Sequence, residues 1–220
     1  MIKLQNLNKN YKTRRGEIQV LKNINLHIKE GELCLLQGRS GSGKTTLLHI
    51  IASLIKPSGG SVEVMGENIA KYSDYHASLY RRDTLAYITQ NFYLFEELSV
   101  YENLLPPLLI KNLNQKELKQ RINTALQAAN IVHKTDERVA ALSKGEKQRV
   151  IIARALVNKQ KIILCDEPTA NLDKENALAF LELLQTLKRK GHTLFIATHD
   201  TIFDTIQADK RFYIEEGSLE

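Results

Sequence analysis

The octapeptide GRSGSGKT, from Gly38 to Thr45, constrains the fold of this chain more than any other stretch. It fits the pattern G-x-x-x-x-G-K-[ST], with the apolar run ELCLLQ before it and the helical pattern KTTLLHIIASL after it. Strand, glycine-rich loop and helix in this order form a cradle in which backbone N–H groups and a lysine hold nucleotide phosphates. The loop therefore predicts an α/β domain with a phosphate site at the start of a helix.

Different residues of this loop are suited to the phosphates and to Mg²⁺. Gly38, Gly41 and Gly43 let successive N–H groups converge on phosphate oxygens, Lys44 reaches the β- and γ-phosphates, and the Thr45 hydroxyl suits Mg²⁺. The remaining members of the predicted phosphate site are Arg39, Ser40, Ser42 and Thr46.

A carboxylate that ends a buried strand is expected to complete the metal site. The run IILCDEP supplies Asp166 for Mg²⁺ and Glu167 to face an attacking water. The alternative for this pair is a helix N-cap ahead of the next turn. The long insert between Lys44 and Asp166, and the absence of an N-K-x-D motif, exclude a compact small GTPase.

The pattern along the chain predicts one domain, 1–220, with a core at about 1–90 and 159–220 and a helical subdomain at about 91–158. In the last third, strands alternate with helices, which favours a parallel sheet covered on both faces. The expected strands are 1–7, 18–28, 31–37, 61–65, 84–89, 161–167, 193–198 and 210–214. The expected helices are 43–55, 116–131 and 177–188, with an amphipathic helix opened by the Ser/Gly turn in 142–156 and a short helix between the last two strands. In 116–131 the apolar stripe is Leu118, Ile122, Ala125, Leu126 and Ala129.

Composition narrows the class of protein. A content of 43% hydrophobic residues supports a real core, and a net charge of +6 is most often a solvated surface. Cys34 and Cys165 stand inside apolar runs and are expected as buried thiols in a reducing cytoplasm. The start of the chain lacks signal-peptide features, and no apolar run approaches the roughly 18–20 residues of a membrane span. We expect a soluble chain that reaches a membrane only through a partner.

Together these motifs resemble the nucleotide-binding subunit of ATP-binding cassette (ABC) transporters, over essentially the whole chain. Four further elements appear in the family's order: Gln90 in AYITQNF, the signature-like LSKGEKQR, ANLD ending at Asp173, and His199 in IATHD. The resemblance implies a P-loop NTPase fold: a RecA-like core with an N-terminal antiparallel β subdomain and an inserted α-helical subdomain.

The resemblance also assigns roles. Tyr11 would lie against adenine, Gln90 would touch Mg²⁺ and its water, and His199 would contact the γ-phosphate. The reaction it implies is attack of water on the γ-phosphoryl group, with Glu167 polarising the water and Lys44 taking developing charge. The competing interpretations are an ordinary strand-end tyrosine for Tyr11 and a capping or core histidine for His199.

In this family two subunits pack head to tail around two ATP molecules. Ser143, Gly145 and Glu146 would then meet the phosphate held by the partner subunit, and Asp173 is a further residue that the resemblance assigns to nucleotide binding. The chain departs from the usual L-S-G-G-Q at its last position, Glu146, and at its middle position. There Lys144 adds a Cβ and a positive charge, which bears on turnover rate and dimer affinity.

The same resemblance implies partners. The segment QNFYLFEELSVYENLLPPLLI lies where the family receives a coupling helix of integral membrane permease subunits, although its Tyr93/Leu94/Phe95/Leu98 cluster also reads as core packing. Within the family, the amino-acid sequence resembles the LolD/MacB branch of lipoprotein release and macrolide export. The alternatives are an FtsE-like cell-division ATPase and a soluble non-transport ABC ATPase. We expect a homodimer on the cytoplasmic face of the membrane. No nucleic acid is expected, because the basic stretch NKNYKTRRGE lacks interleaved aromatics.

Overall fold

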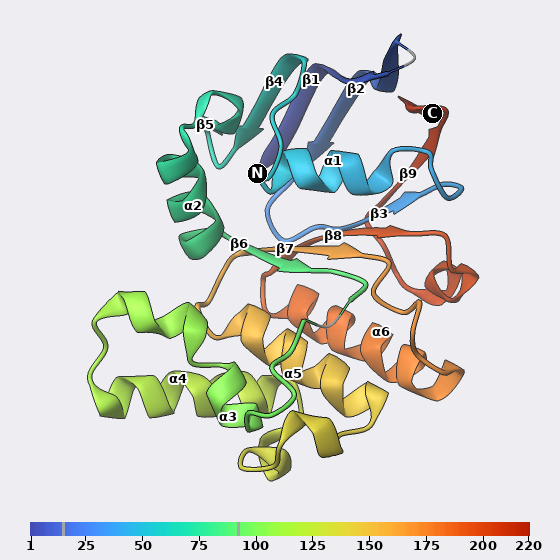
Figure 1. The fold of residues 1–220 in the computed structure, drawn as a ribbon. Helices are drawn as coiled ribbons and strands as arrows, with labels where there is room; N and C mark the ends of the chain where they lie inside the picture. The colour runs from blue at the N-terminus through green and yellow to red at the C-terminus, as the bar shows by residue number, and fades with distance from the viewer. Residues whose placement is uncertain (15, 92) are drawn as a thin grey trace.

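A computed structural model describes residues 1–14, 16–91 and 93–220 of the chain. Within these residues it contains a four-stranded sheet and a six-stranded sheet. Figure 1 shows the layers: the smaller sheet, then helix α1 (Lys44–Ile51), then the larger sheet, then a layer that includes α5 (Lys144–Leu156) and α6 (Lys174–Arg189). The expected α/β organisation is confirmed.

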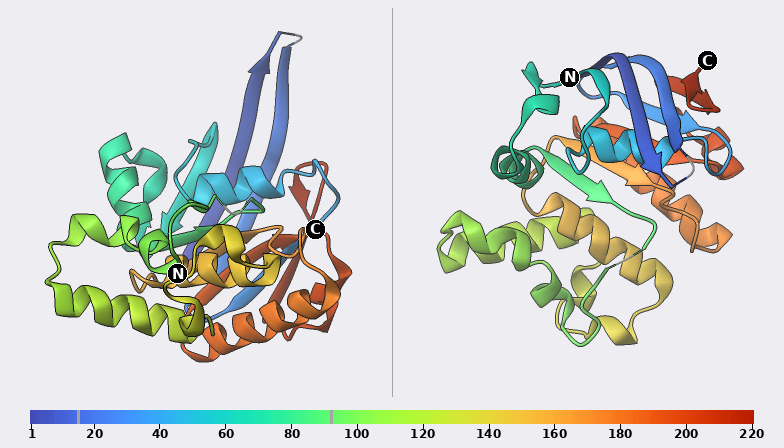
Figure 2. Two further views of the ribbon diagram at one scale, coloured as in Figure 1. Left: turned by 60° about the horizontal axis from the view of Figure 1, so that its bottom comes forward. Right: turned by 45° about the horizontal axis from the view of Figure 1, so that its top comes forward.

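The smaller sheet is antiparallel and has the strand order β2-β1-β4-β5. Its strands are β1 (Ile2–Thr13), β2 (Gly16–Ile28), β4 (Gly59–Val64) and β5 (Glu67–Asn68). The β1–β2 ladder continues to the pair Thr13↔Gly16, beyond the strands expected from the sequence, so the described residues of the basic stretch lie at the end of a hairpin. Figure 2 shows this hairpin projecting from the rest of the chain. Arg15 of that stretch lies outside the described residues.

The larger sheet has the strand order β10-β9-β3-β8-β7-β6 and is parallel except for β10. Its strands are β3 (Leu33–Gln37), β6 (Leu85–Ile88), β7 (Ile162–Asp166), β8 (Thr193–Thr198), β9 (Lys210–Glu215) and β10 (Ser218–Leu219). Every residue of β3, β7 and β8 is buried, because both faces of the sheet are covered. Their side chains alternate between two cores, one shared with α1 and the small sheet, the other with α5 and α6.

Register brings the carboxyl ends of the three central strands together. Gln37 at the end of β3 pairs with Thr198 at the end of β8, and Asp166 at the end of β7 pairs with Ala197. The turns that leave these strands are therefore held at one edge of the sheet, where α/β folds bind ligands. The phosphate loop, Glu167 and His199 all lie directly after these strand ends.

The segment between β6 and β7 is helical, as expected. It holds α3 (Val100–Asn103), α4 (Gln115–Ala128) and α5. Asn114 and Glu117 form a capping box that starts α4. The predicted stripe of this helix is confirmed, because Ile122, Ala125, Leu126 and Ala129 are buried and Leu118 packs partly buried against them. The limits 91–158 for a separate subdomain stay a prediction.

One helix was missed: α2 (Asp74–Asp83), between the two sheets' strands β5 and β6. The sequence carries two local signals for this helix. Ser73 caps the N-terminus by accepting a bond from the His76 N–H, and Arg81 and Arg82 occupy the last turn. Helix α1 is shorter than expected, since Ser53 leaves the helical region with φ 51°. Short 3₁₀ turns cover Ile69–Lys71, Pro106–Lys111, Val132–Lys134, Val139–Ala141 and Thr201–Thr205.

Two further expectations concern burial and membrane crossing. Cys34 and Cys165 are buried free thiols, as predicted. Over the ranges that the structure describes, none of the helices combines the length and the apolar character that crossing a membrane requires.

Candidate functional site

The phosphate loop packs so closely on β9 that its first residue must be glycine. A Cβ on Gly38 would lie 2.3 Å from the backbone oxygen of Ile214, which cannot move without disturbing the strand. The next turn begins α1, whose first N–H groups are free of helix partners and attract anions. Thr46 is partly buried in this first turn. The glycine pattern thus serves the backbone path of the loop as well as its approach to phosphate.

Lys44 is held inside the loop. Its side chain is almost fully buried, and its ammonium Nζ donates to the backbone oxygens of Gly38 at 2.7 Å and Arg39 at 3.0 Å. The same nitrogen lies 3.4 Å from Oε1 of Glu167. The ammonium therefore faces both the loop and the carboxylate that comes directly after β7.

Glu167 is fixed by contacts from three elements. Its backbone has φ 47°, a left-handed conformation that is uncommon for a residue with a side chain, and its N–H donates to the Ala197 oxygen at 2.9 Å. Oε2 accepts a hydrogen bond from the His199 N–H at 3.2 Å, and Oε1 lies 2.8 Å from His199 Nδ1. This strained, well-partnered turn directs the carboxylate toward Lys44, which is the arrangement expected of a functional group rather than of a helix cap.

Asp166 stands next to Glu167 but faces other groups. Thr45 donates from Oγ1 to Asp166 Oδ1 at 3.1 Å, and the Tyr87 hydroxyl donates to Oδ2 at 3.3 Å. Burial raises the pKa of the Asp166 carboxyl above its ordinary value, against the two hydrogen bonds, which lower it. A bound cation would compensate the cost of keeping this carboxylate ionised.

The donor set fits magnesium. Thr45 is exposed, and its hydroxyl and the Asp166 carboxylate are hard oxygen donors of the kind Mg²⁺ prefers. Among the described residues no group of three or more His, Cys, Asp and Glu side chains could hold a metal by itself. Such an ion would therefore take its other ligands from phosphate and water, as Mg²⁺ does at nucleotide sites.

The positions of Gln90 and Tyr11 give less direct support for their predicted roles. Gln90 is exposed just after β6, and its backbone oxygen accepts a bond from Asn171 Nδ2 at 3.1 Å. Tyr11 is 38% exposed on the projecting hairpin, opposite Ile18, with the ammonium of Lys9 4.8 Å from its ring centroid. The contacts of these two side chains with nucleotide or metal stay predictions.

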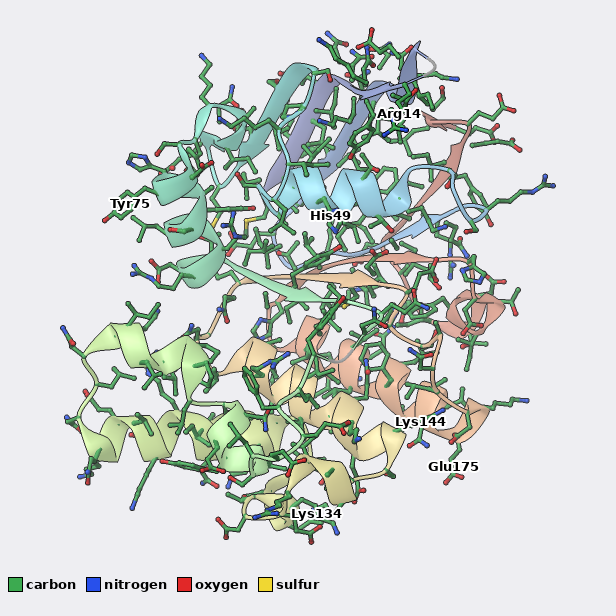
Figure 3. The ribbon with its side chains drawn as sticks, viewed as in Figure 1. Arg14, His49, Tyr75, Lys134, Lys144 and Glu175 are labelled. Carbon is green, nitrogen blue, oxygen red and sulfur yellow. The ribbon has the colours of Figure 1, made fainter. Side chains whose placement is uncertain are left out.

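The signature turn lies away from the phosphate loop of its own chain. Figure 3 shows Lys144 and Glu175 at the neighbouring starts of α5 and α6, on the opposite side of the large sheet from α1. Ser143 caps α5 by accepting a bond from the Glu146 N–H, and the Glu146 carboxylate accepts one from the Ser143 N–H in return. Asp173 caps α6 by accepting a bond from the Asn176 N–H, without a reciprocal bond to its own N–H.

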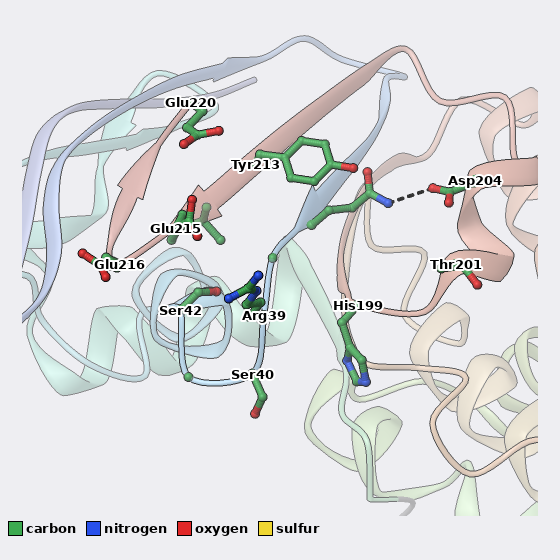
Figure 4. Close-up of a pocket in the computed structure, with 14 residues that line it drawn as sticks. Arg39, Ser40, Ser42, His199, Thr201, Asp204, Tyr213, Glu215, Glu216 and Glu220 are labelled. Carbon is green, nitrogen blue, oxygen red and sulfur yellow. Dashed lines mark hydrogen bonds between the residues drawn. The ribbon is translucent and has the colours of Figure 1, made fainter.

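A cavity of about 560 Å³ opens on the outer side of the phosphate loop (Figure 4). Its walls include Arg39, Ser40 and Ser42 from the loop and His199 from the turn after β8. The carboxylates of Asp204, Glu215, Glu216 and Glu220 also line it. Those charges repel phosphate, which disfavours the parts of the cavity next to them as a phosphate site.

Several residues at the site escaped the sequence analysis. Gln37 donates to Asp204 at 3.0 Å along one wall of the cavity, drawn as a dashed line in Figure 4. Tyr87 supports Asp166, and Asn171 holds the backbone at Gln90. Local sequence gives no signal for Gln37, Tyr87 and Asn171, because each acts through a contact with a distant strand or loop. Ser42, by contrast, is a predicted member of the phosphate site; it is almost fully buried, and its Oγ has no hydrogen-bond partner in the described part of the chain.

The known proteins that this chain resembles belong to one family. The family described as ABC transporter matches residues 21–170. The lipoprotein-releasing system ATP-binding protein LolD of Pseudoalteromonas translucida is 39% identical over 221 residues, covering 100% of this chain and 94% of that protein. The ABC transporter ATP-binding protein YvrO of Bacillus subtilis is 36% identical, and the match covers 100% of this chain and 95% of YvrO. The macrolide export protein MacB of Acinetobacter baylyi is 38% identical over 91% of this chain, which spans only 30% of MacB.

Solved structures show the same fold. The dimeric structure of the bacterial ABC transporter cassette MJ0796 superposes with a TM-score of 0.90 at 36% identity, covering 100% of this chain and 97% of that one. A second structure of MJ0796, a dimeric post-hydrolysis state bound to ADP and Pi, matches equally well. At this similarity the shared fold extends over the whole chain.

Proposed function

The chain belongs to the ABC transporter family, and on this basis we propose that two copies of it close head to tail around two ATP molecules. The chain is an ATP-binding subunit with ATPase activity that powers a membrane transporter complex, and the ABC ATPase fold expected from its motifs is confirmed. The proposal extends this family membership to the roles of single residues, to the metal and to the partners.

The observation that carries the mechanism is the position of Glu167 between Lys44 and His199. Glu167 accepts a proton from the water that attacks the γ-phosphoryl group, and His199, bonded to the same carboxylate, orients that water and the phosphate. Lys44 takes up charge that develops on the phosphoryl oxygens. Thr45 and Asp166 would hold a magnesium ion, which would supply further positive charge at the phosphates.

The other predicted contacts complete the nucleotide site. The backbone N–H groups of the loop residues from Gly38 to Gly43, with the side chains of Ser40, Ser42 and Thr46, hold the phosphates. Tyr11 packs on the adenine, and Gln90 would contribute to holding a magnesium ion. The unpartnered, buried Oγ of Ser42 supports a polar ligand at this loop.

The signature turn supplies donors to the partner's ATP. Ser143 uses its Oγ as an acceptor for the Glu146 N–H, which leaves its hydroxyl proton free to donate to phosphate. The Gly145 N–H lies in the first turn of α5 and adds a second donor, since that turn has no helix partner for it. Glu146 fixes the turn through the capping box, and Asp173 caps the neighbouring helix beside it.

The membrane partner docks on the segment between β6 and α4. Its exposed apolar side chains are Tyr93, Phe95, Leu98, Leu109 and Ile110. Of the Tyr93/Leu94/Phe95/Leu98 cluster, Leu94 packs partly buried against the core, so the core-packing interpretation holds for that residue and not for the three exposed ones. Phe92 lies outside the described residues. Exposed apolar side chains gathered on one segment fit a protein interface.

We place the complex at the cytoplasmic face of the membrane, held there by permease subunits, with a transport role of the LolD or MacB type. That choice rests on the lipoprotein-releasing and macrolide-export names of two relatives. An FtsE-like role in cell division and a soluble non-transport role are the alternatives. No nucleic acid takes part.

The decisive experiment is affinity purification of the tagged chain from detergent-solubilised native membranes, with Tyr93→Ala/Phe95→Ala as the matched variant. We expect a multi-span membrane protein to be recovered with the wild-type chain and lost with the double variant, while ATPase activity of the isolated chain persists. Recovery of ribosomes or DNA instead would overturn the transport role.

A further inference from the structure

The start of α5 is packed against the start of α6 within the same chain. Gly145 is buried, and a Cβ built on it would lie 2.0 Å from Oδ1 of Asn176 and 2.5 Å from its Cγ. The space left between the two helices here is about 10 Å³, at the lower limit of what one water needs, roughly 10–15 Å³. The glycine of the signature turn is therefore required by an intrachain neighbour, whatever the turn binds.

Asn176 is itself held in one orientation. Its N–H donates to Asp173 Oδ1 at 2.9 Å, and its side-chain Nδ2 donates to Oδ2 of the same carboxylate at 2.8 Å. These two bonds lower the pKa of Asp173, which keeps the carboxylate ionised as their acceptor. With Nδ2 engaged, the amide oxygen is left facing Gly145. The turn of α5 and the cap of α6 are thus fitted to each other.

A second tie lies one turn further along α5. Gln148 is 2% exposed and donates from Nε2 to the backbone oxygen of Pro168 at 3.1 Å, a buried hydrogen bond. Pro168 is the residue directly after Glu167. The short segment that leads from Glu167 to Asp173 therefore meets α5 near both of its ends: Gln148 bonds Pro168, and Asn176, which bonds Asp173, packs against Gly145.

We propose that Asn176 and Gln148 are positioning residues that make the signature turn and the turn carrying Glu167 one mechanical unit. This inference rests on the proposed dimer. There, Ser143 and Gly145 of one chain meet the ATP of its partner, whereas Glu167 acts on the ATP of its own chain. A shift of the signature turn on the partner's γ-phosphate is transmitted through the two ties to Glu167, so filling one site aligns the catalytic carboxylate of the other.

The test is a double-mutant cycle on Gly145 and Asn176 in the full chain. Gly145→Ala is expected to lower kcat because its new methyl group meets Asn176. Asn176→Ala is expected to lower kcat roughly 10-fold or more, with KM for ATP changed less than about twofold and the Hill coefficient for ATP reduced to about 1. In Gly145→Ala/Asn176→Ala the clash partner is gone, so kcat equals that of Asn176→Ala. If the fold loss of kcat in the double variant instead equals the product of the two single losses, Gly145 is required by the partner's phosphate. That result would overturn the proposal.

Gln148→Met probes the second tie, since it preserves length and removes the donor to Pro168. We expect the same fall in kcat and Hill coefficient, and wild-type values would overturn its part in the proposal. Asn123→Ala, at an exposed position of α4, is the matched control and is expected to behave as wild type. Thermal unfolding of each variant identifies loss of fold.

Measuring the wild-type chain first separates the positioning role from the proposed function on which it rests. A wild-type chain that neither hydrolyses ATP nor dimerises with it would remove the proposed function. A cooperative, ATP-dependent wild-type dimer whose Asn176→Ala form keeps its kcat and Hill coefficient would remove only the positioning role.

Discussion

Nζ of Lys44 and Oε1 of Glu167 lie 3.4 Å apart, and the same carboxylate oxygen lies 2.8 Å from Nδ1 of His199. One oxygen atom is thus shared by the start of α1, the turn after β7 and the turn after β8. The side chains of Lys44 and Glu167 are 6% and 15% exposed, so neither charge is well hydrated and each depends on the other. This contact therefore joins the proposed catalytic carboxylate to the lysine of the phosphate loop.

Glu167→Gln should abolish turnover and preserve ATP binding. The amide keeps the shape of the side chain but cannot accept a proton from water, and loss of a general base costs roughly 10²–10⁴-fold in rate. We expect phosphate release to fall at least 100-fold and ATP with Mg²⁺ to trap a dimer, visible by light scattering after gel filtration. Glu182→Gln, exposed on α6, is the control. Turnover at the wild-type rate would remove Glu167 from its role.

Lys44→Ala should lose affinity for ATP. The change removes the cation that faces the phosphates and leaves the carbonyls of Gly38 and Arg39 without their donor. We expect at least a 10-fold higher Kd in a fluorescent ATP titration, in line with the roughly 1.5–3 kcal/mol of a hydrogen bond to a charged group. Lys161→Ala, whose side chain is 60% exposed, should bind as wild type. Equal affinities for the two variants would contradict the assignment.

Asp166→Asn should stabilise the fold at neutral pH while impairing Mg²⁺-dependent hydrolysis. Burial raises the pKa of Asp166 above 3.8, so between the two values the folded chain holds a proton that the unfolded chain has released. The free energy of unfolding therefore falls as pH rises through that window, and it stays lowered at neutral pH. Asparagine removes this cost.

Thermal unfolding without nucleotide tests this account. We expect the Asp166→Asn variant to melt a few degrees above wild type at pH 7, since about 1 kcal/mol corresponds to roughly 2–4 °C in a domain of this size. The difference should shrink as the pH falls below about 4, where the unfolded aspartate is protonated as well. A variant less stable than wild type at pH 7 would contradict the burial argument.

The two thiols should be unreactive in the native chain. Burial raises the pKa of Cys34 to about 12 and raises that of Cys165 as well, so at pH 8 both are protonated and shielded. A disulfide reagent should modify neither in minutes under native conditions, and both after unfolding in guanidinium. Rapid labelling of either thiol in the folded chain would show that its strand opens.

Sequence reasoning succeeded where a signal is local and repeated. The phosphate loop, the Asp166–Glu167 pair and the stripe of α4 depend on spacing along one segment, which survives in any context that folds. It failed at α2, where the cap at Ser73 and the basic last turn were the available signals, and at the hairpin of β1 and β2, whose length depends on pairing between strands. The structure gives the positions of the predicted site residues, but their roles in binding and catalysis, including those of Tyr11, Gln90 and Asp173, stay predictions.

The sequence by itself determined that this chain folds as an α/β nucleotide-binding domain of the ABC family, because the glycine loop, the buried strands and the order of the motifs allow few alternatives. Tertiary structure alone decided that Glu167 is held between Lys44 and His199, that Tyr87 supports Asp166, and that Gly145 is required by Asn176. The physical reason is distance: these groups come from segments far apart in the chain, and strand register and helix packing bring them within a few ångströms.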